Sequence, residues 1–167
     1  MKTKRKEKMK TKKTIKIIGI LILIMMMILL IIAGYFILVD IESKAPEEVQ
    51  ETCHLEVKEY KNRKVFIITP KEETTNPLKI LYFHGGSYVA EASKDHWNFI
   101  QKIVETTKAT IIMPDYPLTP KHNYKDVFEM VEPLYQEIIQ KIDTKNLILM
   151  GDSARRRIST SFRGKNK

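Results

Sequence analysis

The chain has 167 residues and a formal net charge of +9, but its basic residues gather at the two ends. Residues 2–16 carry nine basic side chains and one acid, and residues 155–167 carry six basic side chains and no acid, whereas residues 17–154 hold 14 basic and 19 acidic side chains. A nucleic-acid-binding protein spreads basic residues over a folded face, so this distribution argues against nucleic acid as a partner. Cys53 is the only cysteine, which excludes an internal disulfide.

Residues 17–39 form an uncharged stretch of 23 residues, mostly Ile, Leu and Met, directly after the Lys-rich head at residues 1–16. As a helix with a rise of about 1.5 Å per residue, this stretch would be roughly 34 Å long, enough to cross a hydrocarbon core about 30 Å thick. A cleaved signal peptide also begins with basic residues and an apolar run, but this run is longer than the usual signal core and has no A-x-A cleavage pattern. We therefore expect an uncleaved single-pass membrane anchor, with a signal peptide as the alternative.

The basic head also predicts how the anchor is oriented. Lys and Arg next to a membrane helix favour the cytoplasmic side, which would place everything after Asp40 on the outer face of the cell membrane. The same Lys cluster is expected to attract anionic lipid headgroups. The membrane is therefore the partner that this region predicts.

Residues 40–53 are polar and contain Pro46, so we expect a linker that precedes a domain over residues 54–154. In chain order, the predicted elements of this domain are strands at 55–60, 65–68 and 80–83, a helix at 95–107, a strand at 110–113, a helix at 126–142 and a strand at 147–150. Strands that alternate with helices of this length predict an α/β fold with a mostly parallel sheet flanked by helices.

Two motifs follow predicted buried strands at their carboxyl ends, where open α/β sheets bind ligands. HGGSY begins at His84, after the strand at 80–83, and GDSA begins at Gly151, after the strand at 147–150. A serine on a tight strand-to-helix turn exposes its hydroxyl above the sheet, and a glycine-rich loop offers backbone N–H groups to an oxyanion. Each motif alone is weak, but together they favour acyl transfer by a serine nucleophile.

The segments HGGSYV, MPDYPLTPKHNY and NLILMGDSA occur in this order within about residues 55–154. Together they resemble the hormone-sensitive-lipase-like branch of the α/β-hydrolase fold, which comprises esterases and lipases. The resemblance implies the N-terminal half of an α/β-hydrolase, here preceded by one transmembrane helix. It implies hydrolysis of small carboxylic esters, with no metal and no organic cofactor.

The resemblance also implies roles for individual residues. Ser153 would be the nucleophile, and the N–H groups of Gly85, Gly86 and Ala154 would form the oxyanion hole. The residues that support these motifs are His84, Gly151, Asp152 and Asp115, and residues 115–120 would brace the loops around the site. His84 is interpreted as a loop-fixing side chain, because the family places its general base after the serine. The remaining histidines, His54, His96 and His122, are interpreted as surface residues.

The last part of the chain departs from the family pattern. Arg155 stands where the elbow has its closing glycine, and we expect its side chain to clash with the neighbouring strand. The family order is Ser, then Asp or Glu, then His, but the 14 residues after Ser153 contain no acid and no histidine. A serine hydroxyl without a base is a weak nucleophile. We therefore expect a truncated chain without activity, in which the last strand leaves an apolar edge exposed.

Residues 155–167 are interpreted as an aberrant basic tail, because a one-base shift in one choice of codons converts RRRISTSFRGKNK into the glycine-rich, helix-like GGGFQLALEEKI. Two functional hypotheses remain. The first is a carboxylic-ester hydrolase, as the family implies. The second is a non-catalytic fragment tethered to the membrane, either the product of a decayed gene or a small interaction protein.

Overall fold

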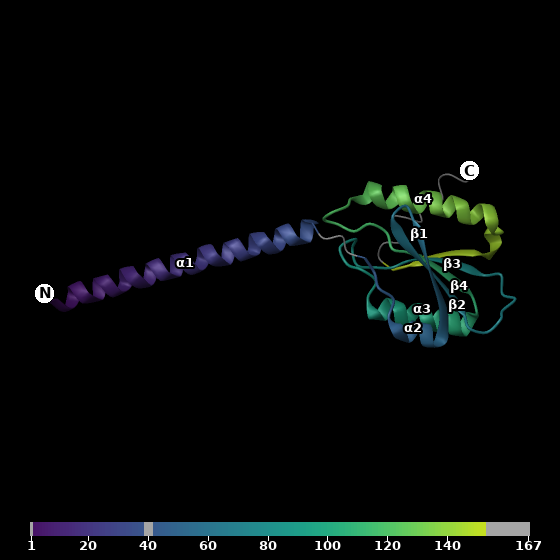
Figure 1. Cartoon of the computed structure of the whole chain (residues 1–167), viewed down its shortest axis with the longest axis horizontal. Coiled ribbons are helices and arrows are strands. Elements are labelled where there is room, and N and C mark those ends of the chain that lie inside the picture. Colours follow the sequence, from purple (N-terminus) through teal and green to yellow (C-terminus); the bar gives the residue numbers. More distant parts are fainter. Residues whose placement is uncertain (1, 39–41, 153–167) are drawn as a thin grey trace. The chain divides into compact units, whose positions relative to one another are not determined.

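The computed structural model describes residues 2–38 and 42–152. The chain divides into two compact units, Met1–Val39 and Asp40–Lys167. The first unit contains one helix and the second contains a sheet with helices on both faces (Figure 1).

Helix α1 (Lys2–Leu38) is the first unit. Its stretch Lys13–Tyr35 has a mean hydropathy of 3.2 and is long and apolar enough to cross a membrane. The Ile, Leu and Met side chains of this stretch are exposed. The prediction of one long apolar helix is confirmed. The basic head and the apolar stretch, expected as separate segments, share one continuous helix.

In the second unit, the described residues form a five-stranded sheet with the strand order β1-β2-β4-β3-β5. The strands are β1 (Cys53–Tyr60), β2 (Arg63–Pro70), β3 (Lys79–Phe83), β4 (Thr110–Pro114) and β5 (Leu147–Gly151). Strands β1, β2 and β4 pair antiparallel, whereas β3 pairs parallel with both β4 and β5. The prediction of an α/β sheet flanked by helices is confirmed, but the sheet is mixed rather than mostly parallel.

A two-residue turn explains why β1 and β2 pair antiparallel. Lys61 and Asn62 join β1 to β2, and both have positive φ, 50° and 60°. Two residues in this conformation close a hairpin, in this case around the Tyr60–Arg63 pair, and a hairpin forces its strands to run antiparallel.

The helices of the second unit cover both faces of the sheet. They are α2 (Glu47–Thr52), α3 (Lys94–Thr107) and α4 (Tyr124–Lys141), and a short 3-10 turn, η1 (Thr144–Asn146), precedes β5. Helices α2 and α3 lie on one face and α4 lies on the other (Figure 1). Both α3 and α4 begin with a capping box, in which Ser93 and Asn123 are the N-caps.

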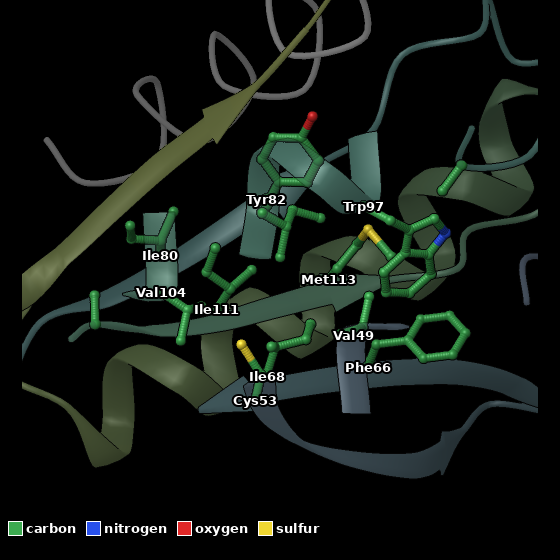
Figure 2. Packing of buried hydrophobic residues seen from close by; sticks show 13 residues of the cluster. Val49, Cys53, Phe66, Ile68, Ile80, Tyr82, Trp97, Val104, Ile111 and Met113 are labelled. Atoms are coloured by element: carbon green, nitrogen blue, oxygen red, sulfur yellow. The ribbon is translucent and has the colours of Figure 1, made fainter. Parts of the chain in front are cut away.

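Strand β3 separates two hydrophobic clusters because its side chains alternate between the two faces. Leu81 and Phe83 pack in the cluster under α4. Ile80 and Tyr82 pack in the cluster under α2 and α3, which Figure 2 shows. Phe66 and Trp97 meet edge to face in this second cluster, with their ring centroids 5.1 Å apart. The alternation fixes which residues of β3 and its loop face each helix layer.

The segment expected as a linker is partly folded onto the sheet. Ser43 is buried, and its N–H donates to both carboxylate oxygens of Asp115 at 3.0 Å. Val49 of α2 and Cys53 at the start of β1 are buried in the cluster of Figure 2. These two apolar side chains lie four residues apart, so one side of an otherwise polar segment is buried against the sheet. The linker predicted at 40–53 is therefore wrong for residues 43–53.

Candidate active site

The glycine motif and the serine motif leave the sheet at the same edge. Strands β3 and β5 are parallel neighbours, and their pairing ends with Phe83 opposite Gly151. The residues that follow also meet, since the Asp152 N–H donates to the Phe83 carbonyl oxygen at 3.2 Å. A Cβ placed on Gly85 would lie 3.1 Å from the Asp152 Cβ. Two motifs that lie 66 positions apart in the sequence, at Gly85 and Gly151, are therefore neighbours in space.

Gly151 permits this close approach of β3 and β5. A Cβ on Gly151 would overlap the carbonyl oxygen of Phe83 and would lie 3.0 Å from its carbonyl carbon. The obstructing atoms belong to the backbone of the central strand and cannot rotate away. The requirement for glycine directly before Asp152 is therefore steric.

The loop after β3 is a tight turn built on Gly86. Gly86 has a φ of +112°, and a Cβ there would lie 2.7 Å from the carbonyl oxygen of Ala90. The N–H groups of Val89 and Ala90 both donate to the Gly86 carbonyl oxygen, at 2.9 and 3.1 Å. Ser87 and Tyr88 also have positive φ, 54° and 62°. Within the described residues the N–H groups of Gly86 and Ser87 meet no acceptor, so two adjacent donors are open at this edge.

The loop after β4 holds the glycine loop in place. The Tyr116 hydroxyl donates to the carbonyl oxygen of His84 at 2.5 Å. The N–H and the hydroxyl of Thr119 both donate to the carbonyl oxygen of Tyr88, at 2.7 and 3.0 Å. Residues 115–120 therefore contact the glycine loop at its beginning and at its end.

His84 is buried and neutral, and it lies between the glycine loop and the loop after β4. Its ring stacks on Tyr116 with centroids 4.4 Å apart, and its Nδ1 lies 2.7 Å from the Gly85 carbonyl oxygen. Burial lowers the pKa of His84 to about 4. A side chain enclosed in this way holds the loop and has no open face for a substrate.

The Asp115 carboxylate contacts the N-terminal segment and β2. It accepts hydrogen bonds from the Ser43 N–H and lies 3.7 Å from Nη2 of Arg63, which is also buried. The Arg63 Nε donates to the Asp115 carbonyl oxygen at 3.0 Å. Burial raises the pKa of the Asp115 carboxyl, and the Ser43 hydrogen bonds and the Arg63 charge oppose this shift. Asp115 thus fastens the N-terminal segment to the end of β4.

Residues 80–160 match the family defined by the α/β hydrolase fold. The second unit of the chain has the α/β-hydrolase fold. An esterase from Acinetobacter venetianus is 30% identical over 84 residues, which are 50% of this chain and 28% of that esterase. An esterase from Gibberella moniliformis is 26% identical over 95 residues, 53% of this chain and 30% of that protein. The chain therefore aligns with less than a third of the length of these curated relatives.

A solved structure agrees with the hydrolase fold. An inferred esterase from Staphylococcus aureus superposes with a TM-score of 0.60 at 27% identity, over 67% of this chain and 37% of that one. The expected resemblance to α/β-hydrolases of the esterase and lipase kind is thus confirmed.

Several predicted residues of the hydrolase site lie outside the described residues. These are the nucleophile Ser153, the oxyanion donor Ala154 and the basic tail at 155–167 with its Arg155. Asp152 is the last described residue before them, and its side chain is 52% exposed.

The surface interpretation of the histidines is correct for His54, which is exposed, and wrong for His96. The His96 side chain is only 17% exposed, and its Nε2 lies 3.0 Å from Asp152 Oδ2 and 3.2 Å from the Gly85 N. Its Nδ1 accepts the Ser93 N–H at 2.9 Å. The Ser-x-x-His spacing, which places His96 in the capping box of α3, is the signal that could have found it.

A small cavity lies beside the glycine loop of the hydrolase. Its volume is about 190 Å³, and most of its lining is apolar. The residues that line it are Ser87, Tyr88, Pro117, Thr119, Asn123, Tyr124, Val127 and Phe128. The cavity therefore lies between the glycine loop, residues 115–120 and the first turn of α4.

Proposed function

We propose that this chain carries the nucleophile and the oxyanion hole of a serine hydrolase that acts on carboxylic esters. The supporting observation is the β3–β5 pairing, which brings the glycine loop and the residue before Ser153 to one edge of the sheet. In this proposal the Ser153 Oγ attacks the acyl carbonyl carbon, the alcohol leaves, and water then releases the acid.

The oxyanion donors in the proposal are backbone N–H groups at the two motifs. The Gly86 N–H is open within the described part of the chain, and the Ala154 N–H would complete the site from the elbow. The Gly85 N–H lies at the same edge but points to His96 Nε2. The adjacent Ser87 N–H is a further open donor, which the sequence had not indicated.

The proposed substrate is a small ester. The cavity of about 190 Å³ beside the loop is smaller than the usual range for drug-sized ligands, roughly 300–1,000 Å³, so a short acyl or alcohol group fits best. Tyr88, Tyr124 and Phe128 line it and favour an apolar group.

We assign no general base to Ser153 from the described residues. The residues after Ser153 contain no histidine or acid, and His84 is enclosed by Tyr116. We therefore propose very low turnover for this polypeptide, with solvent as the base. The alternative, a non-catalytic membrane-tethered protein, rests on the same observation.

A direct assay separates the two functions. The full chain in detergent micelles is tested for hydrolysis of p-nitrophenyl butyrate beside Ser153→Ala, with and without added imidazole as an external base. We expect imidazole to raise turnover in the wild type above the background that Ser153→Ala reports. Equal rates in both proteins at every imidazole concentration, with cooperative unfolding intact, would favour the non-catalytic protein.

We also propose that α1 spans the cell membrane once, with its basic head in the cytoplasm near anionic lipids. The apolar stretch Lys13–Tyr35 and the nine basic residues at 2–16 support this orientation. Protease digestion of sealed cells should remove a C-terminal tag and spare an N-terminal one. A mature protein that lacks the first 30 or so residues by intact mass would instead identify a signal peptide.

A further inference from the structure

One histidine contacts three separate parts of the proposed site. His96 Nε2 lies 3.0 Å from Asp152 Oδ2, next to the serine, and 3.2 Å from the Gly85 N. His96 Nδ1 lies 2.9 Å from both the N and the Oγ of Ser93, the N-cap of α3. The ring therefore bridges the first turn of α3, the glycine loop and the serine elbow.

The two Nε2 contacts require different forms of the ring. An Nε2 that carries a proton donates to Asp152 and cannot accept from Gly85, whereas an unprotonated Nε2 accepts the Gly85 N–H. The partner of the other nitrogen decides between the two forms. Because Nδ1 accepts the Ser93 N–H, the proton belongs on Nε2, where it makes a charge-assisted hydrogen bond to the Asp152 carboxylate.

The other side of Asp152 is held as well. The Tyr82 hydroxyl, from β3, donates to the same Asp152 Oδ2 at 3.0 Å. Burial and the nearby Asp152 charge both raise the pKa of Tyr82, so the hydroxyl keeps its proton and remains a donor. Asp152 is thus fixed between β3 and α3 by two donors.

We infer that His96 is a positioning residue, which holds the serine elbow through Asp152 as its Nε2–H tautomer. This inference rests on the proposed function for its catalytic meaning, but the contacts that it describes are measured without any turnover. The competing explanation is that His96 only caps α3.

Two variants separate these explanations. Gln is the usual third residue of a capping box, so His96→Gln keeps the acceptor for the Ser93 N–H and removes the second ring nitrogen. Ser93→Ala removes the cap and keeps the Nε2 contacts. A positioning role predicts a change at Gly85 and Gly151 in His96→Gln, whereas a capping role predicts a loss of stability in Ser93→Ala alone.

The measurement uses the full chain in micelles, labelled with [¹⁵N]glycine. The chain has six glycines, so at most six amide resonances appear, and the Gly85 resonance is assigned by its loss in Gly85→Ala. We expect His96→Gln to move the Gly85 and Gly151 resonances and to leave those of Gly19 and Gly34, in α1, unchanged. Ser93→Ala should leave all four in place.

Ring-labelled histidine gives the second readout. Of the four histidines, His96 is assigned by its loss in His96→Gln, and its Nε2 should show the shift of a protonated nitrogen and its Nδ1 that of an unprotonated one. Asp152→Asn keeps the shape of the side chain, and we expect it to move the same glycine resonances even where His96→Gln is too unstable to study. Unmoved Gly85 and Gly151 resonances in both variants, or an unprotonated Nε2, would overturn the inference.

Hydrolysis is compared separately in the presence of imidazole. We expect His96→Gln to lower kcat by up to roughly a hundredfold with little change in KM, because a displaced elbow affects the transition state more than binding. If Ser153→Ala leaves hydrolysis unchanged, the proposed function fails. The glycine and histidine-ring resonances still test the contacts of His96 in that case.

Discussion

The two halves of the candidate site differ in how firmly the described structure holds them. The glycine loop follows β3, which has a neighbour on each side and carries the fully buried Leu81 and Phe83. The serine elbow follows β5, the last strand of the described sheet, whose Ile148 is 41% exposed. The comparison teaches that the glycine loop is preassembled, whereas the segment after β5 depends on Gly151 and on the donors around Asp152.

The largest expected difference is between core substitutions on the two strands. Leu81→Ala should lower the free energy of unfolding by about 3 kcal/mol, because it leaves a cavity between the sheet and α4. Ile148→Ala should cost less than about 1 kcal/mol, since the side chain is already partly in water. Chemical denaturation followed by the fluorescence of Trp97, the one tryptophan of the chain, measures both. Equal losses would contradict the difference between the strands.

We expect the free energy of unfolding to depend on pH through the buried His84 of the glycine loop. The pKa of His84 is about 4 in the folded protein against an ordinary value of 6.5, so the unfolded chain binds the proton first as the pH falls. The contribution of His84 is fully present above pH 6.5 and decreases as the pH falls to about 4, by about 3 kcal/mol in total. His84→Asn should unfold with a weaker pH dependence over this range. Parallel pH curves for the two proteins would exclude a buried neutral histidine.

A substitution at Gly86 tests the turn itself. Gly86→Ala should destabilise the protein by about 2 kcal/mol, because alanine is strained at a φ of +112° and its Cβ would approach the Ala90 carbonyl oxygen. Gly19→Ala in α1, where a Cβ meets no atom within 4 Å, is the matched control. Thermal unfolding of both variants gives the comparison, and a neutral Gly86→Ala would mean that the turn relaxes easily.

The smallest effects concern two tyrosine hydroxyls. Tyr116→Phe should cost about 1 kcal/mol, because the buried carbonyl oxygen of His84 loses its donor. Tyr82→Phe should cost less, since the Asp152 carboxylate is half exposed and water can replace the hydroxyl. Denaturation in urea resolves this difference, and a larger loss in Tyr82→Phe would show that the elbow is held more firmly than the loop.

The order of the strands and helices could be predicted because each follows a local pattern. The apolar runs at 80–83, 110–113 and 147–150 correspond to β3, β4 and β5, and glycines that follow a strand indicated where backbone groups approach closely. The shared edge of the two motifs also followed, since parallel strands end on the same side of a sheet.

Other features depend on contacts that are distant in the sequence. The hairpin at Lys61-Asn62 has no glycine, so the antiparallel strands of the mixed sheet carried a weak local signal. His96 contacts Asp152, which follows β5, so this contact joins residues that are distant in the sequence. The contact between the Gly85 N and His96 Nε2 could not be predicted for the same reason, because His96 lies on α3.

The contacts of Ser43 have a practical consequence for preparing a soluble hydrolase unit. Ser43 donates to the buried Asp115 carboxylate, and its hydroxyl accepts the Ala92 N–H at 3.1 Å. A polypeptide that starts at Glu42 keeps both contacts, whereas one that starts at Pro46 leaves a buried carboxylate short of donors. Cleavage just ahead of Glu42 should therefore yield a stable soluble product, and trimming four residues further should cause it to precipitate.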